Sequence, residues 1–92
     1  MITIEEFAKN FDAAVGEPEY EVAFENRKGE YMIIKYSDCV TFQRCGIENG
    51  SGEIRFGSLD ELLSAETIDG ICLKRDWDHV RSIVLDGLEE LM

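Results

Sequence analysis

Three cysteines and one histidine are the residues of this chain that most readily act as nucleophiles or metal ligands. Cys39, Cys45 and Cys72 are odd in number and show no C-x-x-C spacing, which argues against a disulfide framework or a zinc site. Reduced thiols of this kind usually behave as small apolar side chains, so we expect structural thiols. A bond between Cys39 and Cys45 stays an alternative, although five intervening residues in one strand would hold the two thiols too far apart.

A thiol-dependent enzyme is one alternative interpretation of these residues. A nucleophilic cysteine needs a base such as His79, the only histidine, and no motif places it beside a thiol. Cys72 is one candidate, because it precedes an expected helix and a helix N-terminus lowers a thiol pKa. The nearby carboxylates of Asp69 and Asp76 would instead raise the pKa of this thiol. Cys45 is the other candidate nucleophile.

Patterns for metal binding, acid–base catalysis and phosphate binding are missing. The acids beside His79 point in different directions on a helix, and consecutive carboxylates such as Glu89 and Glu90 are typical of a solvated helix face. No glycine-rich stretch ends in Gly-Lys-Ser/Thr, and residues 50–52 are expected to form a hairpin loop. We therefore predict no catalytic residue, no metal site and no cofactor.

The net charge restricts the possible partners. The 92 residues include 20 acids and nine bases, a formal net charge of −11, and 45% are hydrophobic, as in a single folded domain over residues 1–92. Excess negative charge opposes contact with phosphates, so we expect no direct nucleic-acid binding. It also disfavours anionic membranes, and no apolar run approaches the roughly 20 residues that span a bilayer. Without a signal-peptide pattern, the chain is expected in the cytoplasm.

The charge is unevenly distributed along the chain. Residues 1–21 hold six acids and one base, residues 22–57 hold five of each, and residues 58–92 hold nine acids and three bases. The excess therefore lies in segments that we expect to be mostly helical. If helices cover one sheet face, the molecule has an acidic helical side and a mixed, more aromatic sheet side.

Apolar spacing predicts one helix, a run of strands and further helices. Thr3 and Glu6 form a capping-box pattern before a helix over about 4–15, with Glu5 and Asp12 on its exposed side. The elements that follow are four strands over 20–25, 31–36, 39–44 and 53–56 and a short helix over 59–63.

The last segment has two interpretations. Six apolar residues recur there at helical spacing: Leu73, Trp77, Val80, Val84, Leu88 and Leu91. This spacing predicts one helix from about 73 to 90. The alternative is a helix that ends near His79 and a strand over 80–85, which the β-branched residues favour. Gly87 also weakens a continuous helix, by roughly 1 kcal/mol relative to Ala.

These elements predict an α+β fold. Short connections favour a four-stranded antiparallel meander in which sequence neighbours are adjacent. The N-terminal and C-terminal helices each carry one apolar stripe, so both are expected to pack on one face of the sheet, with the short helix between the fourth strand and the last helix.

Candidate binding residues lie on both expected surfaces. Tyr31 and Tyr36 fall on opposite faces of one strand, so one of them points away from the helices, which is typical of a binding patch. A homodimer through this open sheet face is the alternative. The acidic helical side is suited to a basic partner. The candidates are Tyr31, Tyr36, Arg44 and Arg55 on the sheet and Glu5, Asp12, Glu89 and Glu90 on the helices.

A stretch of caps, turns and apolar positions carries the one resemblance. Its residues are Ser58-Leu59-Asp60-Glu61-Leu62-Leu63, Ile68-Asp69-Gly70, Leu73-Lys74 and Trp77-Asp78. This pattern resembles small uncharacterised proteins of low-GC Gram-positive bacteria and their mobile elements. Ile71 and Cys72 depart from it, because polar residues are expected there. The resemblance implies a bacterial source and a shared supersecondary unit, and no activity.

Two classes of binding function fit these observations. The first is a non-enzymatic module that binds or regulates another protein, one with a basic surface. The alternative is a nucleic-acid mimic that inhibits a nucleic-acid-processing enzyme, with carboxylates in place of phosphates.

Overall fold

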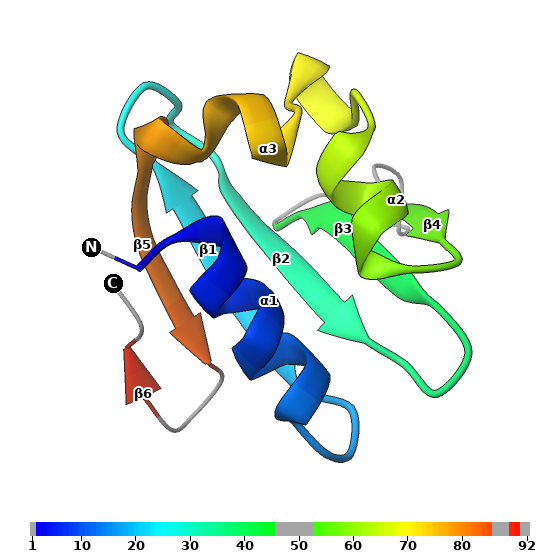
Figure 1. Cartoon of the computed structure of the whole chain (residues 1–92). Coiled ribbons are helices and arrows are strands. Elements are labelled where there is room, and N and C mark those ends of the chain that lie inside the picture. Colours follow the sequence, from blue (N-terminus) through cyan, green and yellow to red (C-terminus); the bar gives the residue numbers. More distant parts are fainter. Residues whose placement is uncertain (1, 46–52, 86–88, 91–92) are drawn as a thin grey trace.

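The computed structural model describes residues 2–45, 53–85 and 89–90 and has an α+β fold (Figure 1). The first helix is followed by four consecutive strands, then by the remaining helical segments, and then by the last two strands of the same antiparallel sheet; two short 3₁₀ turns, η2 and η3, flank α3. The elements are α1 (Ile4–Ala13), β1 (Glu19–Phe24), β2 (Glu30–Lys35), β3 (Val40–Arg44), β4 (Glu53–Phe56), α2 (Leu59–Ser64), η2 (Ile68–Gly70), α3 (Leu73–Asp76), η3 (Trp77–His79), β5 (Val80–Leu85) and β6 (Glu89–Glu90). The expected loop at residues 50–52 lies outside the described residues.

The sheet has the strand order β4-β3-β2-β1-β5-β6. Strands β1 to β4 form the expected meander, with each strand antiparallel to the next. The chain then leaves β4, passes through α2, η2, α3 and η3 across the helical side, and returns as β5 beside β1 (Figure 1). Strands β4 and β5 are therefore consecutive in sequence but separated by three strands in the sheet.

The predicted helix over 73–90 is wrong, and with it the four-stranded sheet. Helical structure ends at His79, and Val80–Leu85 is a strand, as in the alternative interpretation. Without β5, the backbone N–H and C=O groups on one edge of β1 would have no strand to pair with. The antiparallel pairing of β5 with β1 satisfies them. Ile83, opposite Val22, is fully buried. Tertiary pairing therefore outweighs the helical spacing of the apolar residues.

The first helix begins where the sequence predicts and ends earlier. Thr3 and Glu6 make both hydrogen bonds of the capping box. The helix ends at Ala13, and Val15 is 90% exposed, so it does not extend the apolar stripe. The Nζ of Lys35 donates hydrogen bonds to backbone carbonyl oxygens at the end of this helix. The one to the carbonyl oxygen of Phe11 is 2.7 Å long. This ammonium group satisfies acceptors that the helix leaves open and favours the negative end of its dipole.

The hydrophobic core lies between the helices and one face of the sheet (Figure 1). Phe7 of α1 packs edge-on against Tyr20 of β1, with ring centroids 5.2 Å apart. Leu62 of α2 is fully buried in the same cluster. Among the described residues, no helix is both long and apolar enough to cross a bilayer.

Candidate functional site

Tyr31 is not part of an exposed patch. It is 1% exposed, and its ring stacks on Phe42 on the helical side, with centroids 5.5 Å apart. Tyr36 is half-buried just beyond β2, where burial raises its hydroxyl pKa, and Glu53 adds to this effect. The prediction of an aromatic sheet side is therefore wrong, because the strands direct Tyr20, Phe24, Tyr31 and Phe42 into the core.

No helix of the described part of the chain covers the second face of the sheet, which we call the uncovered face (Figure 1). This face is more acidic than the sequence count predicts. Arg44 points to the helical side, where its Nη1 lies 3.5 Å from Asp69 Oδ2, and Lys35 points there too. Both bases are therefore removed from the uncovered face. Arg55, opposite the buried Thr41, remains on this face, and Arg81 lines a hollow there with Glu21 and Glu30. The strand register places four acids on this face: Glu19, Glu21, Glu30 and Glu53.

Two neighbouring hollows lie between the helices. The first has a volume of about 310 Å³, lies between α1 and α2, and has Ala8 and Leu63 among its lining residues. The second, about 320 Å³, extends from the start of α1 to Trp77 of η3. Both are also lined by Ile4, Glu5 and Lys74, so we treat them as one interhelical groove.

The floor of the interhelical groove is apolar because of helical periodicity. Ile4 and Ala8 are one turn apart on α1 and lie beside its buried stripe, and the small side chain of Ala8 leaves space next to Leu63. At the other end, Trp77 Nε1 donates to the carbonyl oxygen of Ile2 at 3.2 Å. This hydrogen bond holds the N-terminal segment against η3.

Charged residues form the rim of the interhelical groove. Glu5, Asp60, Lys74 and Asp78 are all exposed and line one or both hollows. Three acids therefore face one base across an apolar floor. Only Glu5 was among the candidate binding residues; the other three were missed, because no local spacing shows that α2 and η3 meet α1.

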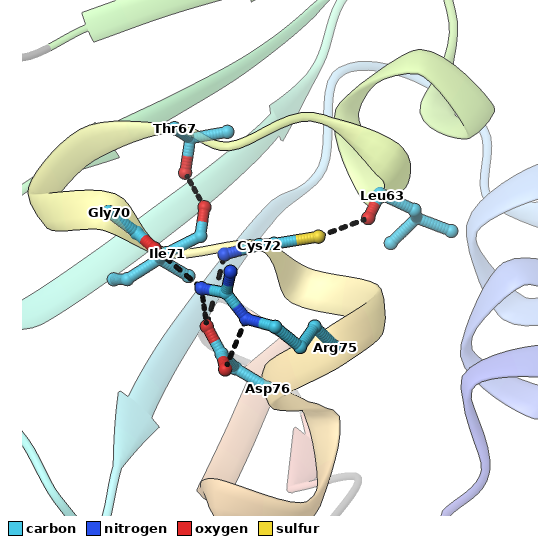
Figure 2. Close-up of polar contacts among 7 residues, drawn as sticks. All are labelled: Leu63, Thr67, Gly70, Ile71, Cys72, Arg75 and Asp76. Atoms are coloured by element: carbon cyan, nitrogen blue, oxygen red, sulfur yellow. Dashed lines mark hydrogen bonds and ion pairs between the residues drawn. The ribbon is translucent and has the colours of Figure 1, made fainter.

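The loop before α3 holds the proposed reactive thiol in a structural network (Figure 2). Arg75 Nη2 donates to the carbonyl oxygen of Gly70 at 2.7 Å and lies 3.0 Å from Asp76 Oδ2. The same carboxylate oxygen accepts from the backbone N–H of Cys72 at 3.0 Å, and the Cys72 Sγ faces the carbonyl oxygen of Leu63 at 3.6 Å (Figure 2). The contacts of Cys72 are therefore those of a loop anchor.

The other two thiols and the histidine lie elsewhere. All three cysteines are free. Burial raises the pKa of the Cys45 thiol, and Glu21 adds to this effect, while desolvation also raises the pKa of Cys39. His79 Nδ1 lies 3.2 Å from Glu25 Oε1 at the end of β1. Within the described parts of the chain, no three potential ligands are grouped to hold a metal ion.

The remaining predicted site residues do not come together. Asp12 is exposed at the far end of α1 from the interhelical groove. Glu89 and Glu90 belong to β6 rather than to a helix, and their side chains lie outside the described part of the structure. Of the predicted residues, Glu5 alone lines the interhelical groove.

No family model, curated protein or solved structure matches this chain. The resemblance of Ser58–Asp78 to small bacterial proteins therefore stays a prediction.

Proposed function

We propose that this chain is a non-enzymatic protein-binding module whose partner docks in the interhelical groove through a basic surface. The observation that carries the proposal is the combination of an apolar floor and a mainly acidic rim. Apolar contact at the centre of an interface supplies affinity, and surrounding charges supply association rate and specificity. The net charge of −11 extends the attraction to basic partners beyond the rim.

The hydrogen bonds made by Cys72, the candidate nucleophile, support a binding function rather than catalysis. Cys72 and His79 make hydrogen bonds to other groups, and neither lines the interhelical groove. A thiol enzyme would need a base within hydrogen-bond reach of its thiol. We propose a cytoplasmic location as well, where three free cysteines would stay reduced.

A matched pair of substitutions on α1 tests the proposal. Ala8→Arg places a long charged side chain in the interhelical groove, while Ala13→Arg makes the same change at an exposed position at the end of α1. Immobilised wild-type chain and Ala13→Arg should retain the same protein from a lysate of the source cell at low salt, and Ala8→Arg should not. The captured protein, once purified, should bind Ala8→Arg at least about tenfold more weakly.

Two results would contradict this proposal. One is equal binding of the purified partner by Ala8→Arg and by the wild type. The other is an affinity that does not change between low and high ionic strength, because contacts with exposed rim charges are screened by salt. Circular dichroism of both variants checks that the fold is retained.

A nucleic-acid mimic is the second candidate, favoured by the glutamates on the uncovered sheet face. Glu21 and Glu53 lie on one row of side chains across β1 to β4, separated by Met32 and Gln43. A mimic would present these carboxylates to a phosphate-binding surface. Glu21→Gln with Glu53→Gln should then weaken binding while Ala8→Arg leaves it unchanged, which is the opposite of the result expected for the interhelical groove.

A further inference from the structure

We infer that the occupant of the interhelical groove is an amphipathic helix of the partner protein, with apolar anchors about one turn apart and Lys or Arg beside them. This inference rests on the proposed function and adds the class of ligand. It follows from the walls, the floor and the rim of the groove, each of which restricts the ligand in a different way.

The walls favour a helix over an extended peptide. The residues that line the two hollows belong to the N-terminal segment, α1, α2, α3 and η3, and none belongs to a strand. An extended segment in this groove would lose water from its backbone N–H and C=O groups without gaining a strand edge to pair with. A helix satisfies these groups internally and packs between other helices at interaxial distances of about 8–10 Å.

The floor sets the spacing of the anchors. One hollow has Ala8 and Leu63 at its base, and the other has Ile2 and Trp77. The two share Ile4, so their centres are neighbours. Side chains three or four residues apart on a helix lie about 5–6 Å apart on one face, which suits two adjacent hollows.

The rim sets the charge of the ligand. Glu5, Asp60 and Asp78 are exposed, and so is the single base, Lys74. Among the described residues, the ion pairs within 4 Å involve none of these four side chains. Their charges are therefore available to a ligand, and a basic helix is attracted by three of them and repelled by one.

Four synthetic peptides of about 18 residues, long enough to form an isolated helix, test these points. The first has two leucines one turn apart and lysines beside them. The second replaces each lysine with glutamate, the third places the same two leucines on opposite faces, and the fourth has a central proline. Fluorescence anisotropy against the full chain should show binding of the first peptide, with each of the others at least about tenfold weaker.

Substitutions in the rim give effects of opposite sign. Lys74→Glu should tighten binding of the lysine peptide by about three- to tenfold, and Asp60→Lys should weaken it by a similar factor. Asp12→Lys is the matched control outside the groove and should change affinity less than twofold. Tighter binding by Lys74→Glu would not result from partial unfolding, so this variant separates a contact from a loss of structure.

Two outcomes would overturn the inference and leave the proposed function intact. The proline peptide could bind as well as the helical one, which would indicate an extended ligand. Alternatively, none of the peptides would bind while Ala8→Arg still abolishes binding of the purified protein partner. If Ala8→Arg affects neither peptide nor protein binding, the proposed function fails together with the inference.

Discussion

Tyr31 and Asp69 form a polar contact at the margin of the core. The Tyr31 hydroxyl donates to Asp69 Oδ2 at 2.6 Å, and Arg44 Nη1 lies 3.5 Å from the same oxygen. Asp69 has φ 57° and ψ 22°, a left-handed conformation that costs a non-glycine residue on the order of 1 kcal/mol. The two contacts fix the carboxylate, and through it the turn that leads from α2 to α3.

Tyr31→Phe tests this contact. We expect it to lower the free energy of unfolding by about 1.5–3 kcal/mol at pH 7, because the lost hydrogen bond is to a charged group. Burial is the main cause that raises the pKa of the Tyr31 hydroxyl above 10, and the hydrogen bond to Asp69 is the second. The contribution is therefore fully present below about pH 10 and is lost as the pH rises through the folded-state pKa. Urea denaturation of both proteins from pH 7 to 11 should show the difference shrinking.

Tyr20→Phe is the matched control for this substitution. Its hydroxyl donates to a neutral group, Asn10 Oδ1, at 3.0 Å, so the loss should be about 0.5–1.5 kcal/mol. A Tyr20→Phe effect as large as that of Tyr31→Phe would contradict a special role for Asp69.

Asp76→Asn tests the loop before α3. The hydrogen bond from Arg75 holds the pKa of Asp76 below its usual value, so its contribution is present at neutral pH and is lost as the pH falls below about 4, through the folded-state pKa. Arg75 is 58% exposed, so solvent screening limits the effect to about 0.5–1 kcal/mol. Thermal melts between pH 2 and 7 should show that the variant is destabilised above pH 4 and that the difference shrinks as the pH falls from 4 through the folded-state pKa of Asp76.

The C-terminal strand shows that one apolar pattern fits two structures. The repeat of apolar residues from Leu73 onwards is helical in spacing, yet β5 places Ile83 in the core and Val84 on the other face of the sheet. In the helix that the spacing predicts, Val84 would belong to the buried stripe and Ile83 would not. The pairing of β5 with β1 decides between them.

A pair of alanine substitutions distinguishes the two structures of this segment. Ile83→Ala should lower the free energy of unfolding by about 2–4 kcal/mol, because it leaves a cavity in the core. Val84→Ala, on the half-exposed face, should cost less than about 1 kcal/mol. Chemical denaturation measures both, and a larger effect of Val84→Ala would indicate the helix instead of the strand.

The charge of the whole molecule acts against its own stability and against self-association. The net charge is −11, and the molecule measures 29 × 28 × 26 Å. A homodimer through the uncovered sheet face would bring two copies of this glutamate-rich patch together, because a two-fold interface uses the same patch of both subunits. We therefore favour a monomer over the homodimer considered from the sequence.

Salt dependence tests the effect of this charge. At 0.01 M ionic strength the Debye length of about 30 Å spans the molecule, whereas at 0.15 M it is about 8 Å. Adding salt at pH 7 should therefore stabilise the fold, by on the order of 1 kcal/mol or about 4–8 °C in Tm. At pH 4.3, near the isoelectric point, salt should have little effect. A Tm that falls with salt at pH 7 would show that local ion pairs outweigh the repulsion.

Much of the fold can be predicted from local patterns. The capping box of Thr3 and Glu6, the alternation in β1 to β4 and the start of the short helix α2 all appear where they are expected. Each depends on residues within a few positions of one another. The candidate site is predicted less well, because the interhelical groove combines residues from α1, α2, α3 and η3.

The sequence by itself determined the first helix, the four-stranded meander and the size and sign of the net charge. The tertiary structure decided that Lys35 and Arg44 face the helices, that Val80–Leu85 is a strand, and that Glu5 meets Lys74 across a groove. The physical reason is the range of the interactions. Caps, turns and periodicity act between near neighbours, whereas strand pairing and helix contact join segments far apart in the chain and depend on which apolar faces the whole fold can bury.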